Sequence, residues 1–350
     1  MTGATAPHAR PSHETLDVDR LSAWLNENAE GFAGPLSFKK FEGGQSNPTF
    51  LMTTRDARFV LRRQPMGPLL KGAHAVDREA HVMGALGGAD FPVPRVHALC
   101  TDESVIGSSF YVMDFVEGRI FWDGGLPEVP KAERGAYHSA IAATLASLHT
   151  HDPATLGLGD YGRPERYFER QLKRWTTQYR ADEAAGRYAD MDAVADWLEV
   201  RVPREATTRL VHGDYRIDNL VFHPSEPRII AVLDWELSTL GDPIVDFAYN
   251  LLMYRVPSAM PWGLADRDLC ALGIPDEAAY VADYCRRTGR ENIPDLDIYI
   301  VFNLFRMAAI IHGIKGRMLR GNAAAAEAGA MVAHLDLIAH IARDTAKRAG

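Results

Sequence analysis

Two short segments hold the residues whose types and spacing could do chemistry. Residues 210–220 and residues 229–236 each carry a carboxylate after an apolar run that predicts a β-strand, Asp214 in the first and Asp234 in the second. Asn219 follows Asp214 in the same tight loop. A carboxylate that orients an attacking hydroxyl, together with two oxygen ligands for magnesium, is typical of phosphoryl transfer. The pattern therefore predicts Asp214 as the catalytic residue, and Asn219 and Asp234 as metal ligands.

A purely structural explanation competes with this one. Asp214 and Asn219 could simply hydrogen-bond the backbone of a turn, as these residue types often do. That explanation would suffice for either residue alone. Three oxygen-bearing residues at set spacings between apolar strands favour the catalytic interpretation.

The same residues carry a family resemblance. His212-Gly213-Asp214-x4-Asn219, with Asp234 after the next strand, resembles the catalytic loop and metal-binding aspartate of the aminoglycoside phosphotransferase family. This family is the small-molecule branch of the protein-kinase-like fold. The resemblance implies a bilobal α+β fold, with an antiparallel-sheet N-lobe and a mainly helical C-lobe. It also implies ATP and Mg²⁺ as cofactors, with GTP left open as the nucleotide.

The composition limits the class of protein. A chain of 350 residues can bury a sizeable core, and its formal net charge of -8 argues against general nucleic-acid binding. The three cysteines have no CxxC spacing, so we expect neither a disulfide framework nor a zinc site, and a cytoplasmic location fits best. Residues 1–15 lack the order of a signal peptide and are predicted to form a flexible tail. The most apolar stretch, residues 298–314, is interrupted by polar residues and predicts a buried helix rather than a membrane span.

The N-terminal part of the chain predicts a phosphate-binding loop. Between residues 36 and 62, short apolar runs alternate with turns, as in an antiparallel sheet. The turn at residues 42–47 is the candidate loop, because glycine lets a backbone approach phosphate oxygens closely. Its candidate nucleotide contacts are Gly43, Gly44, Ser46 and Asn47. A simple hairpin turn is the alternative.

A charged pair is predicted behind this loop. Arg62 stands in the third predicted strand, where the kinase-like pattern has a lysine that contacts nucleotide phosphates. A guanidinium can serve there because it is always charged and binds phosphate oxygens bidentately. Glu79, in the following helix, is the predicted ion-pair partner of Arg62. The alternatives are that Arg63 or neither arginine faces the phosphates, and that Glu79 is a solvated helix residue.

Residues 109–118 form a predicted buried strand that runs into a glycine-ended turn. This segment resembles the kinase hinge, which implies that the Asp114 carbonyl and the Val116 amide contact the adenine edge. An ordinary strand end is the alternative.

The remainder of the chain is mostly helical in pattern. Together with the predicted hinge, the resemblance implies an N-lobe at residues 16–116 and a C-lobe at residues 117–350. A basic amphipathic helix is predicted over residues 163–180, and one face gathers the cations Arg166, Arg170, Lys173 and Arg174. A solvated face is the default interpretation of such a run, and a wall that binds an anionic substrate is the alternative. Glu236, close to Asp234, is a further candidate substrate contact.

The segment after Asp234 argues against a protein substrate. It is too short for a protein-kinase activation segment before the helix that contains Asp246. Asp242, directly before Pro243, predicts a helix N-cap. Asp246 is expected to brace the catalytic loop rather than to perform chemistry.

Several motifs resemble one branch of the family more closely. Residues 156–164, 171–175, 305–310 and 320–322 look like the phosphotransferase domain of acyl-CoA dehydrogenase family members 10 and 11. This resemblance implies an ATP-dependent kinase for a small-molecule hydroxyl, with a hydroxyacyl-CoA as first candidate and neither nucleic acid nor membrane as partner. The alternatives are an aminoglycoside or macrolide phosphotransferase, which the basic helix disfavours, and a nucleotide-binding pseudokinase, which only Arg62 supports. The oligomeric state is left open.

Overall fold

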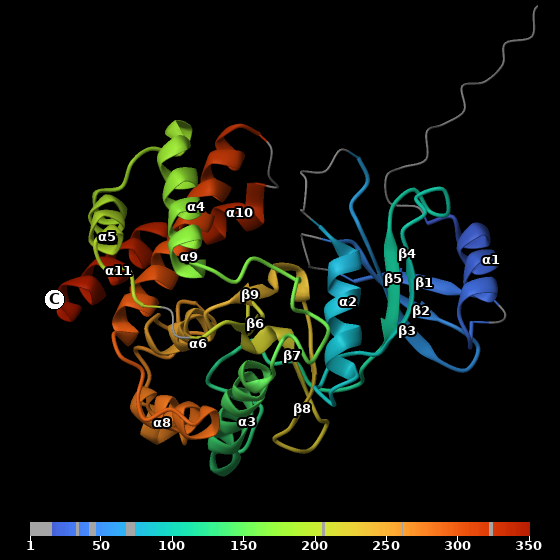
Figure 1. Cartoon of the computed structure of the whole chain (residues 1–350), viewed down its shortest axis with the longest axis horizontal. Helices are drawn as coiled ribbons and strands as arrows, with labels where there is room; N and C mark the ends of the chain where they lie inside the picture. The colour runs from blue at the N-terminus through green and yellow to red at the C-terminus, as the bar shows by residue number, and fades with distance from the viewer. Residues whose placement is uncertain are drawn as a thin grey trace, which may run out of the picture. The chain divides into compact units, whose positions relative to one another are not determined.

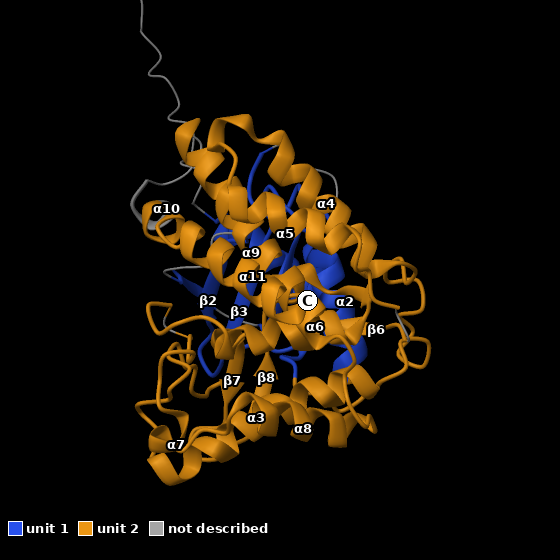
Figure 2. Cartoon of the chain, turned by 90° about the vertical axis from the view of Figure 1, so that its left-hand side faces the viewer, with its two compact units in different colours: residues 1–87, 93–116 blue, residues 88–92, 117–350 orange. Residues whose placement is uncertain are grey.

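The chain forms two compact units (Figure 2). Unit 1 comprises Met1–Gly87 and Val93–Val116, and unit 2 comprises Gly88–Pro92 and Glu117–Gly350. The structure, a computed structural model, describes residues 16–32, 35–41, 47–67, 74–204, 207–260, 262–321 and 325–350. The predicted tail at residues 1–15 and the predicted phosphate-loop residues Gly43, Gly44 and Ser46 lie outside the described residues.

Unit 1 is a five-stranded antiparallel sheet flanked by two helices, with strand order β1-β2-β3-β5-β4 (Figure 1). The strands predicted between residues 36 and 62 are confirmed, with ends that differ by a residue or so, and the strand predicted within residues 109–118 is confirmed as the shorter β5. The elements are α1 (Val18–Asn28), β1 (Ser37–Lys40), β2 (Thr49–Thr53), β3 (Arg58–Arg63), α2 (Val76–Gly87), β4 (Val96–Cys100) and β5 (Phe110–Asp114).

Because side chains alternate along β3, Phe59 and Leu61 lie on one face of the sheet and Arg62 lies on the other. Phe59 and Leu61 lie in the apolar core that includes Leu21 and Leu25 of α1. Arg62 points to the opposite face, because successive side chains of a strand alternate between faces. Arg62 thereby faces α2 rather than the α1 core.

Unit 2 is built around one long buried helix, α9 (Leu296–Leu319), which contacts α4, α5, α6, α10 and α11 (Figure 1). By length and composition α9 could cross a membrane, but 78% of its most apolar window is buried inside the protein. The predicted buried helix is thus confirmed as a core helix. The other helices are α3 (Lys131–Thr150), α4 (Tyr167–Ala181), α5 (Ala189–Glu199), α6 (Pro243–Asn250), α7 (Leu269–Leu272), α8 (Glu277–Thr288), α10 (Ala325–Val332) and α11 (Leu335–Ala349).

Two short antiparallel ribbons bring the functional loops together. β6 (Arg209–Val211) pairs with β9 (Thr239–Gly241), and β7 (Leu220–Phe222) pairs with β8 (Ile229–Val232). Short 3-10 turns complete the loops at Ile217–Asn219, Trp235–Leu237 and Leu251–Tyr254, and another lies at Glu183–Ala185. The ends of β6, β7 and β8 therefore converge on the predicted catalytic loop.

The basic helix starts later than predicted. α4 begins at Tyr167, and Arg166 precedes it as an N-cap residue with a left-handed backbone, φ 51°. Pro164 disfavours helical backbone at Arg163, the residue before it, and the left-handed backbone of Arg166 sets the start of the helix at Tyr167. The predicted helical face over residues 163–180 is therefore wrong for Arg166.

Candidate active site

The catalytic loop makes a sharp turn at Gly213. This residue has φ +83°, a conformation that residues with a Cβ rarely adopt, and an added Cβ would lie 2.7 Å from the Leu237 carbonyl oxygen. Only glycine therefore fits between β6 and the segment after Asp234. The turn directs the next residue, Asp214, away from the β6–β9 ribbon.

The side chain of Asp246, in α6, holds the backbone of this turn by hydrogen bonds. Its Oδ2 accepts a hydrogen bond from the His212 amide at 2.7 Å, and its Oδ1 accepts one from the Gly213 amide at 2.8 Å. His149 Nε2 lies 3.3 Å from Oδ2. Burial raises the pKa of Asp246, but the hydrogen bond and charge of His149 and the loop amides outweigh burial, so the net pKa is lowered. The expected bracing by Asp246 is confirmed.

The carboxylate of Asp214 has different partners on its two oxygens. Oδ1 accepts a hydrogen bond from Tyr249 Oη at 2.6 Å and lies 3.2 Å from Arg216 Nε. Oδ2 lies 3.3 Å from Asn219 Nδ2, which also donates to the Asp214 carbonyl at 2.9 Å. Oδ2 is thus the less engaged oxygen, and it is the one suited to receive a proton from a hydroxyl.

Asp234 lies next to this loop through backbone contacts. The Leu233 amide donates to the Asn219 carbonyl at 2.9 Å, and His212 Nε2 donates to the Leu233 carbonyl at 2.9 Å. Asp234 itself has a left-handed backbone with φ 65° and ψ 65°, which is uncommon for a residue other than glycine. The structure thus brings Asp214, Asn219 and Asp234 together at the ends of β6, β7 and β8.

Two charged residues that the sequence analysis did not single out complete this cluster. Arg216 is ion-paired with both Asp214 and Asp218, with Nη2 3.1 Å from Asp218 Oδ2. Burial lowers the pKa of Arg216, but the charge of Asp214 and its neighbours outweighs burial and raises it. Burial, despite the opposing charge of Arg216, raises the pKa of Asp218. Their place directly after Asp214 in the sequence was the only signal that could have identified them.

The donor set fits a magnesium ion that is shared with phosphates. Mg²⁺ prefers oxygen ligands and is commonly held by one or two protein groups, with water and substrate phosphates filling the remaining positions. Asn219 and Asp234 offer such oxygens. Within the described ranges, no group of three or more His, Cys, Asp or Glu side chains is placed to hold a metal ion.

A cavity of about 500 Å³ opens beside Asp214. Its polar lining comes from Asp214, Arg216, Tyr249, Arg306 and His334. The remaining wall is apolar and comes mainly from α9, α10 and the loop before α7: Leu237, Met260, Trp262, Met307, Ile310, Ile311, Ala330 and Met331. Most of these residues lie far from Asp214 in the sequence, and no motif assigns them to its site, although residues 305–310 resemble a family motif.

The predicted ion pair forms in unit 1. Arg62 Nε lies 3.0 Å from Glu79 Oε2, and the Glu79 side chain is only 1% exposed. Tyr111 Oη and Asn47 Nδ2 also donate to Glu79, at 3.1 Å and 2.8 Å. The Asn47 side chain is therefore engaged with Glu79, which leaves its backbone for the predicted nucleotide contact.

At the predicted hinge, the side chain of Asp114 accepts a hydrogen bond from His97 Nε2 at 2.6 Å. Val116 is partly buried and ends unit 1. Their backbone contacts with adenine stay predictions.

The cations of the basic helix do not line the cavity beside Asp214. Arg166 is paired with Glu169, and Arg170 donates to the Arg163 carbonyl. Lys173 and Arg174 are exposed, and the Arg174 guanidinium lies 5.0 Å from the Trp175 ring. Glu236, in the turn after Asp234, is partly buried and also does not line the cavity.

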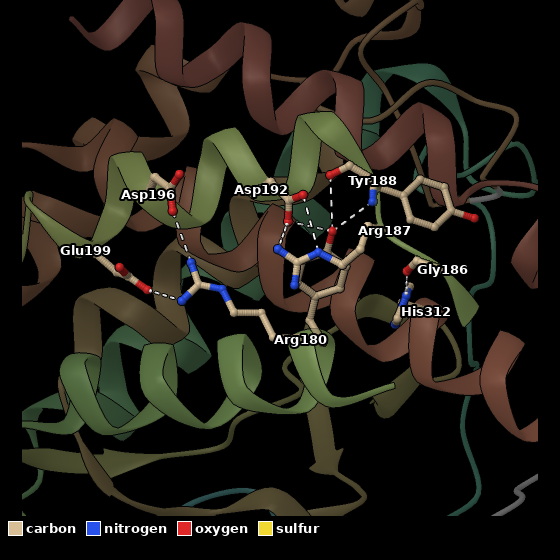
Figure 3. Close-up of polar contacts among 9 residues, drawn as sticks. Arg180, Gly186, Arg187, Tyr188, Asp192, Asp196, Glu199 and His312 are labelled. Carbon is tan, nitrogen blue, oxygen red and sulfur yellow. Dashed lines mark hydrogen bonds and ion pairs between the residues drawn. The ribbon is translucent and has the colours of Figure 1, made fainter. Parts of the chain in front are cut away.

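Figure 3 shows how the other end of α4 is attached to α5. Arg180 binds Asp196 at 3.0 Å and Glu199 at 2.9 Å. The hydroxyl of Tyr179 donates to Asp192 at 2.9 Å. These contacts join the C-terminal end of α4 to α5.

Known proteins resemble this chain over most of its length. Acyl-CoA dehydrogenase family member 10 from Mus musculus is 40% identical over 349 residues, which cover 98% of this chain and 33% of that protein. Acyl-CoA dehydrogenase family member 11 from Gallus gallus is 44% identical over 319 residues, which cover 89% of this chain and 41% of that protein. The chain thus spans between a third and about two fifths of the length of these relatives.

Solved structures give the same result for the fold. A candidate aminoglycoside phosphotransferase from Ralstonia eutropha JMP134 is 46% identical, with a TM-score of 0.87 over 95% of this chain and 99% of that chain. Aminoglycoside phosphotransferase APH(4)-Ia, in a ternary complex with ADP and hygromycin B, is 16% identical with a TM-score of 0.58 over 91% of this chain and 97% of that one. The second likeness shows a shared kinase-like α+β fold. The phosphotransferase enzyme family matches residues 37–292, and with these relatives the match shows that the chain belongs to that family.

Proposed function

We propose that this chain is an ATP- and magnesium-dependent kinase that phosphorylates a hydroxyl of a small molecule, and that this molecule is a hydroxyacyl-CoA. One observation carries the proposal. The Asp214 carboxylate lines a mainly apolar cavity, while its hydrogen-bond partner Asn219 contacts the residue before Asp234. A carboxylate that can take a proton, two candidate magnesium ligands and a cavity for the molecule to be phosphorylated thereby occur together.

The geometry suggests the following chemistry. The acceptor hydroxyl would donate to Asp214 Oδ2, because Oδ1 is already occupied by Tyr249 and Arg216. As the hydroxyl oxygen forms its bond to the γ-phosphorus, its proton passes to the carboxylate and the bond to ADP breaks. Asn219 and Asp234 would hold Mg²⁺, which when bound neutralises phosphate charge.

The nucleotide would be bound by residues of unit 1. Arg62, held by Glu79 at 3.0 Å, supplies a cation for the phosphates. The loop residues Gly43, Gly44 and Ser46 and the hinge residues Asp114 and Val116 complete this proposed site. Nucleotide binding by the structurally similar APH(4)-Ia supports ATP.

The cavity wall favours an apolar acceptor. Aminoglycosides are polycations, and two guanidinium groups, Arg216 and Arg306, line the cavity. The names of the two relatives associate them with acyl-CoA chemistry. The exposed cations Lys173 and Arg174 of α4 are the candidate contacts for the anionic part of CoA, outside the cavity.

A panel of acceptors tests the proposal. ATP consumption would be measured with hydroxyacyl-CoAs, free hydroxy acids, aminoglycosides and choline-like alcohols. We expect turnover with a hydroxyacyl-CoA, and a loss of roughly 10²–10⁴-fold in Asp214→Asn with nucleotide binding retained. Asp234→Ala should instead lose magnesium-dependent nucleotide binding in calorimetry, since the metal loses its anionic ligand. Turnover with aminoglycosides alone would favour the antibiotic kinase, and no turnover with any acceptor would favour the pseudokinase.

A further inference from the structure

Arg306 of α9 is a buried cation that lines the cavity beside Asp214. It is 8% exposed. Nη2 donates to the Gly213 carbonyl at 2.7 Å, and Nε is buried without a hydrogen-bond partner. Among the residues that the structure describes, no carboxylate lies within the 4.0 Å that defines an ion pair with Arg306.

The second guanidinium of the cavity provides a contrast. Arg216 is ion-paired with two carboxylates, those of Asp214 and Asp218. Arg306 has no such ion pair among the described residues, and besides the Gly213 carbonyl its guanidinium lies 5.2 Å from the Tyr249 ring and 5.9 Å from the Trp175 ring. Ring faces attract a cation but accept few of its five N–H donors. A buried guanidinium that has no carboxylate partner among the described residues and whose Nε has no hydrogen-bond partner, at the wall of a cavity, indicates a ligand with an oxygen acceptor.

Arg306 lies close to Asp214, so a ligand oxygen bound to Arg306 would also lie close to the hydroxyl that reacts at Asp214. Arg306 donates to the carbonyl of Gly213, the residue before Asp214. Its guanidinium also lies 5.2 Å from the ring of Tyr249, whose hydroxyl donates to Asp214 at 2.6 Å. One side chain therefore separates the guanidinium from the carboxylate that would receive the hydroxyl proton. The wall beside them is apolar, with Met307, Ile310 and Ile311 on the same helix.

We propose that Arg306 determines acceptor specificity by binding an acyl oxygen of the molecule whose hydroxyl is phosphorylated. The acceptor is then an aliphatic chain that carries a hydroxyl toward Asp214 and a carboxylate or thioester carbonyl toward Arg306. A carboxylate would take two guanidinium donors and a thioester carbonyl one. The inference rests on the proposed function only in assigning the hydroxyl to Asp214.

Matched acceptors test the role of Arg306. The full chain would be assayed with hydroxyhexanoate, with its CoA thioester, and with hexanediol, which lacks the acyl oxygen. Arg306→Gln keeps an amide donor for the Gly213 carbonyl but removes the charge. Arg317→Gln, at an exposed position of the same helix, is the control.

We expect Arg306→Gln to raise the KM of at least one acyl acceptor roughly 10- to 100-fold, as for a lost hydrogen bond to a charged group, with the KM of hexanediol unchanged. An effect on the free acid would identify a carboxylate, and an effect on the thioester alone a carbonyl. An equal rise for hexanediol would mean that Arg306 acts only by holding Gly213, and would overturn the inference. Should Arg306→Gln fail to fold, Arg306→Lys keeps the charge without the planar fork. It should raise the KM of the same acyl acceptor by a smaller factor, with the KM of hexanediol unchanged.

Binding without turnover separates this inference from the proposed function. Calorimetry would use hexanoate and hexanoyl-CoA, which lack the hydroxyl. Binding that is lost in Arg306→Gln and kept in Asp214→Asn supports the inference even if no acceptor is phosphorylated. Equal binding to wild type and Arg306→Gln, or no binding to wild type, would refute the inference even if the kinase reaction is found.

Discussion

At the scale of single residues, the two carboxylate oxygens of Asp214 differ in their hydrogen-bond partners. Oδ1 is held by Tyr249 and Arg216, whereas Oδ2 has only a long contact with Asn219. The carboxylate is therefore fixed by one oxygen and can react through the other. Tyr249 acts through Asp214 and is a positioning residue.

Removal of the Tyr249 hydroxyl should separate positioning from binding. We expect Tyr249→Phe to lower kcat roughly tenfold, the low end for a hydrogen bond to a charged group, because Arg216 still holds Oδ1. The KM values of both substrates should change little. Steady-state kinetics on the best acceptor of the panel is the measurement. A rise in acceptor KM at unchanged kcat would instead assign Tyr249 to substrate binding.

The Arg62–Glu79 pair makes a second prediction at this scale. Arg62→Lys keeps a cation beside Glu79 and should retain nucleotide binding. Arg62→Met leaves the 1% exposed Glu79 without that cation, so it should weaken MgATP binding and destabilise the fold by about 3–5 kcal/mol. Calorimetry and urea unfolding measure the two effects. Normal nucleotide affinity in Arg62→Met would remove Arg62 from the proposed mechanism.

At the scale of secondary-structure elements, α6 determines the shape of the catalytic loop. Its N-cap Asp242 accepts a hydrogen bond from the Ile244 amide at 2.9 Å, with Pro243 in the first turn, as the sequence predicts. One turn later Asp246 binds two loop amides, and Tyr249 then reaches Asp214. One short helix thus holds both the backbone of the loop and its carboxylate.

Loss of Asp246 should therefore affect stability as well as activity. We expect Asp246→Ala to cost about 3–5 kcal/mol, because the buried His212 and Gly213 amides and His149 lose their partner. Asp276→Ala, which removes the N-cap hydrogen bond to the Ala279 amide of α8, should cost only about 1 kcal/mol. Urea unfolding of both variants makes the comparison. Equal costs would show that Asp246 is an ordinary cap-like residue.

At the scale of the whole molecule, buried titratable groups set the pH range of stability. Burial lowers the pKa of His138, on α3, to about 4, and its Nε2 donates to the Gly124 carbonyl at 3.1 Å. An unfolded histidine has a pKa of about 6.5. Between these values the unfolded chain binds a proton that the folded chain does not, so stability falls as the pH falls. Asp246, whose pKa is lowered, adds a loss at more acidic pH, below about 4.

A non-titrating replacement should remove the first of these losses. His138→Gln can still donate to the Gly124 carbonyl but binds no proton. We expect wild type to lose about 1.4 kcal/mol more per pH unit than the variant between about pH 6.5 and 4. Urea unfolding at several pH values measures the difference in slope. Parallel curves would place the folded pKa of His138 near its ordinary value.

The sequence by itself determined the family and the local chemistry, whereas the tertiary structure decided the environment of that chemistry. Asp214, Asn219 and Asp234 share one loop and one ribbon, so their spacing alone predicts that they meet, and the Arg62–Glu79 pair follows from strand and helix order. Tyr249 and Arg306 reach the same loop from α6 and α9, and Arg306 lies 93 residues from Gly213. Nothing in their local sequence indicates this, because such contacts arise only when α9 packs against α6. The apolar cavity has the same origin, since its walls come from segments that are separate in the sequence and adjacent only in the folded unit.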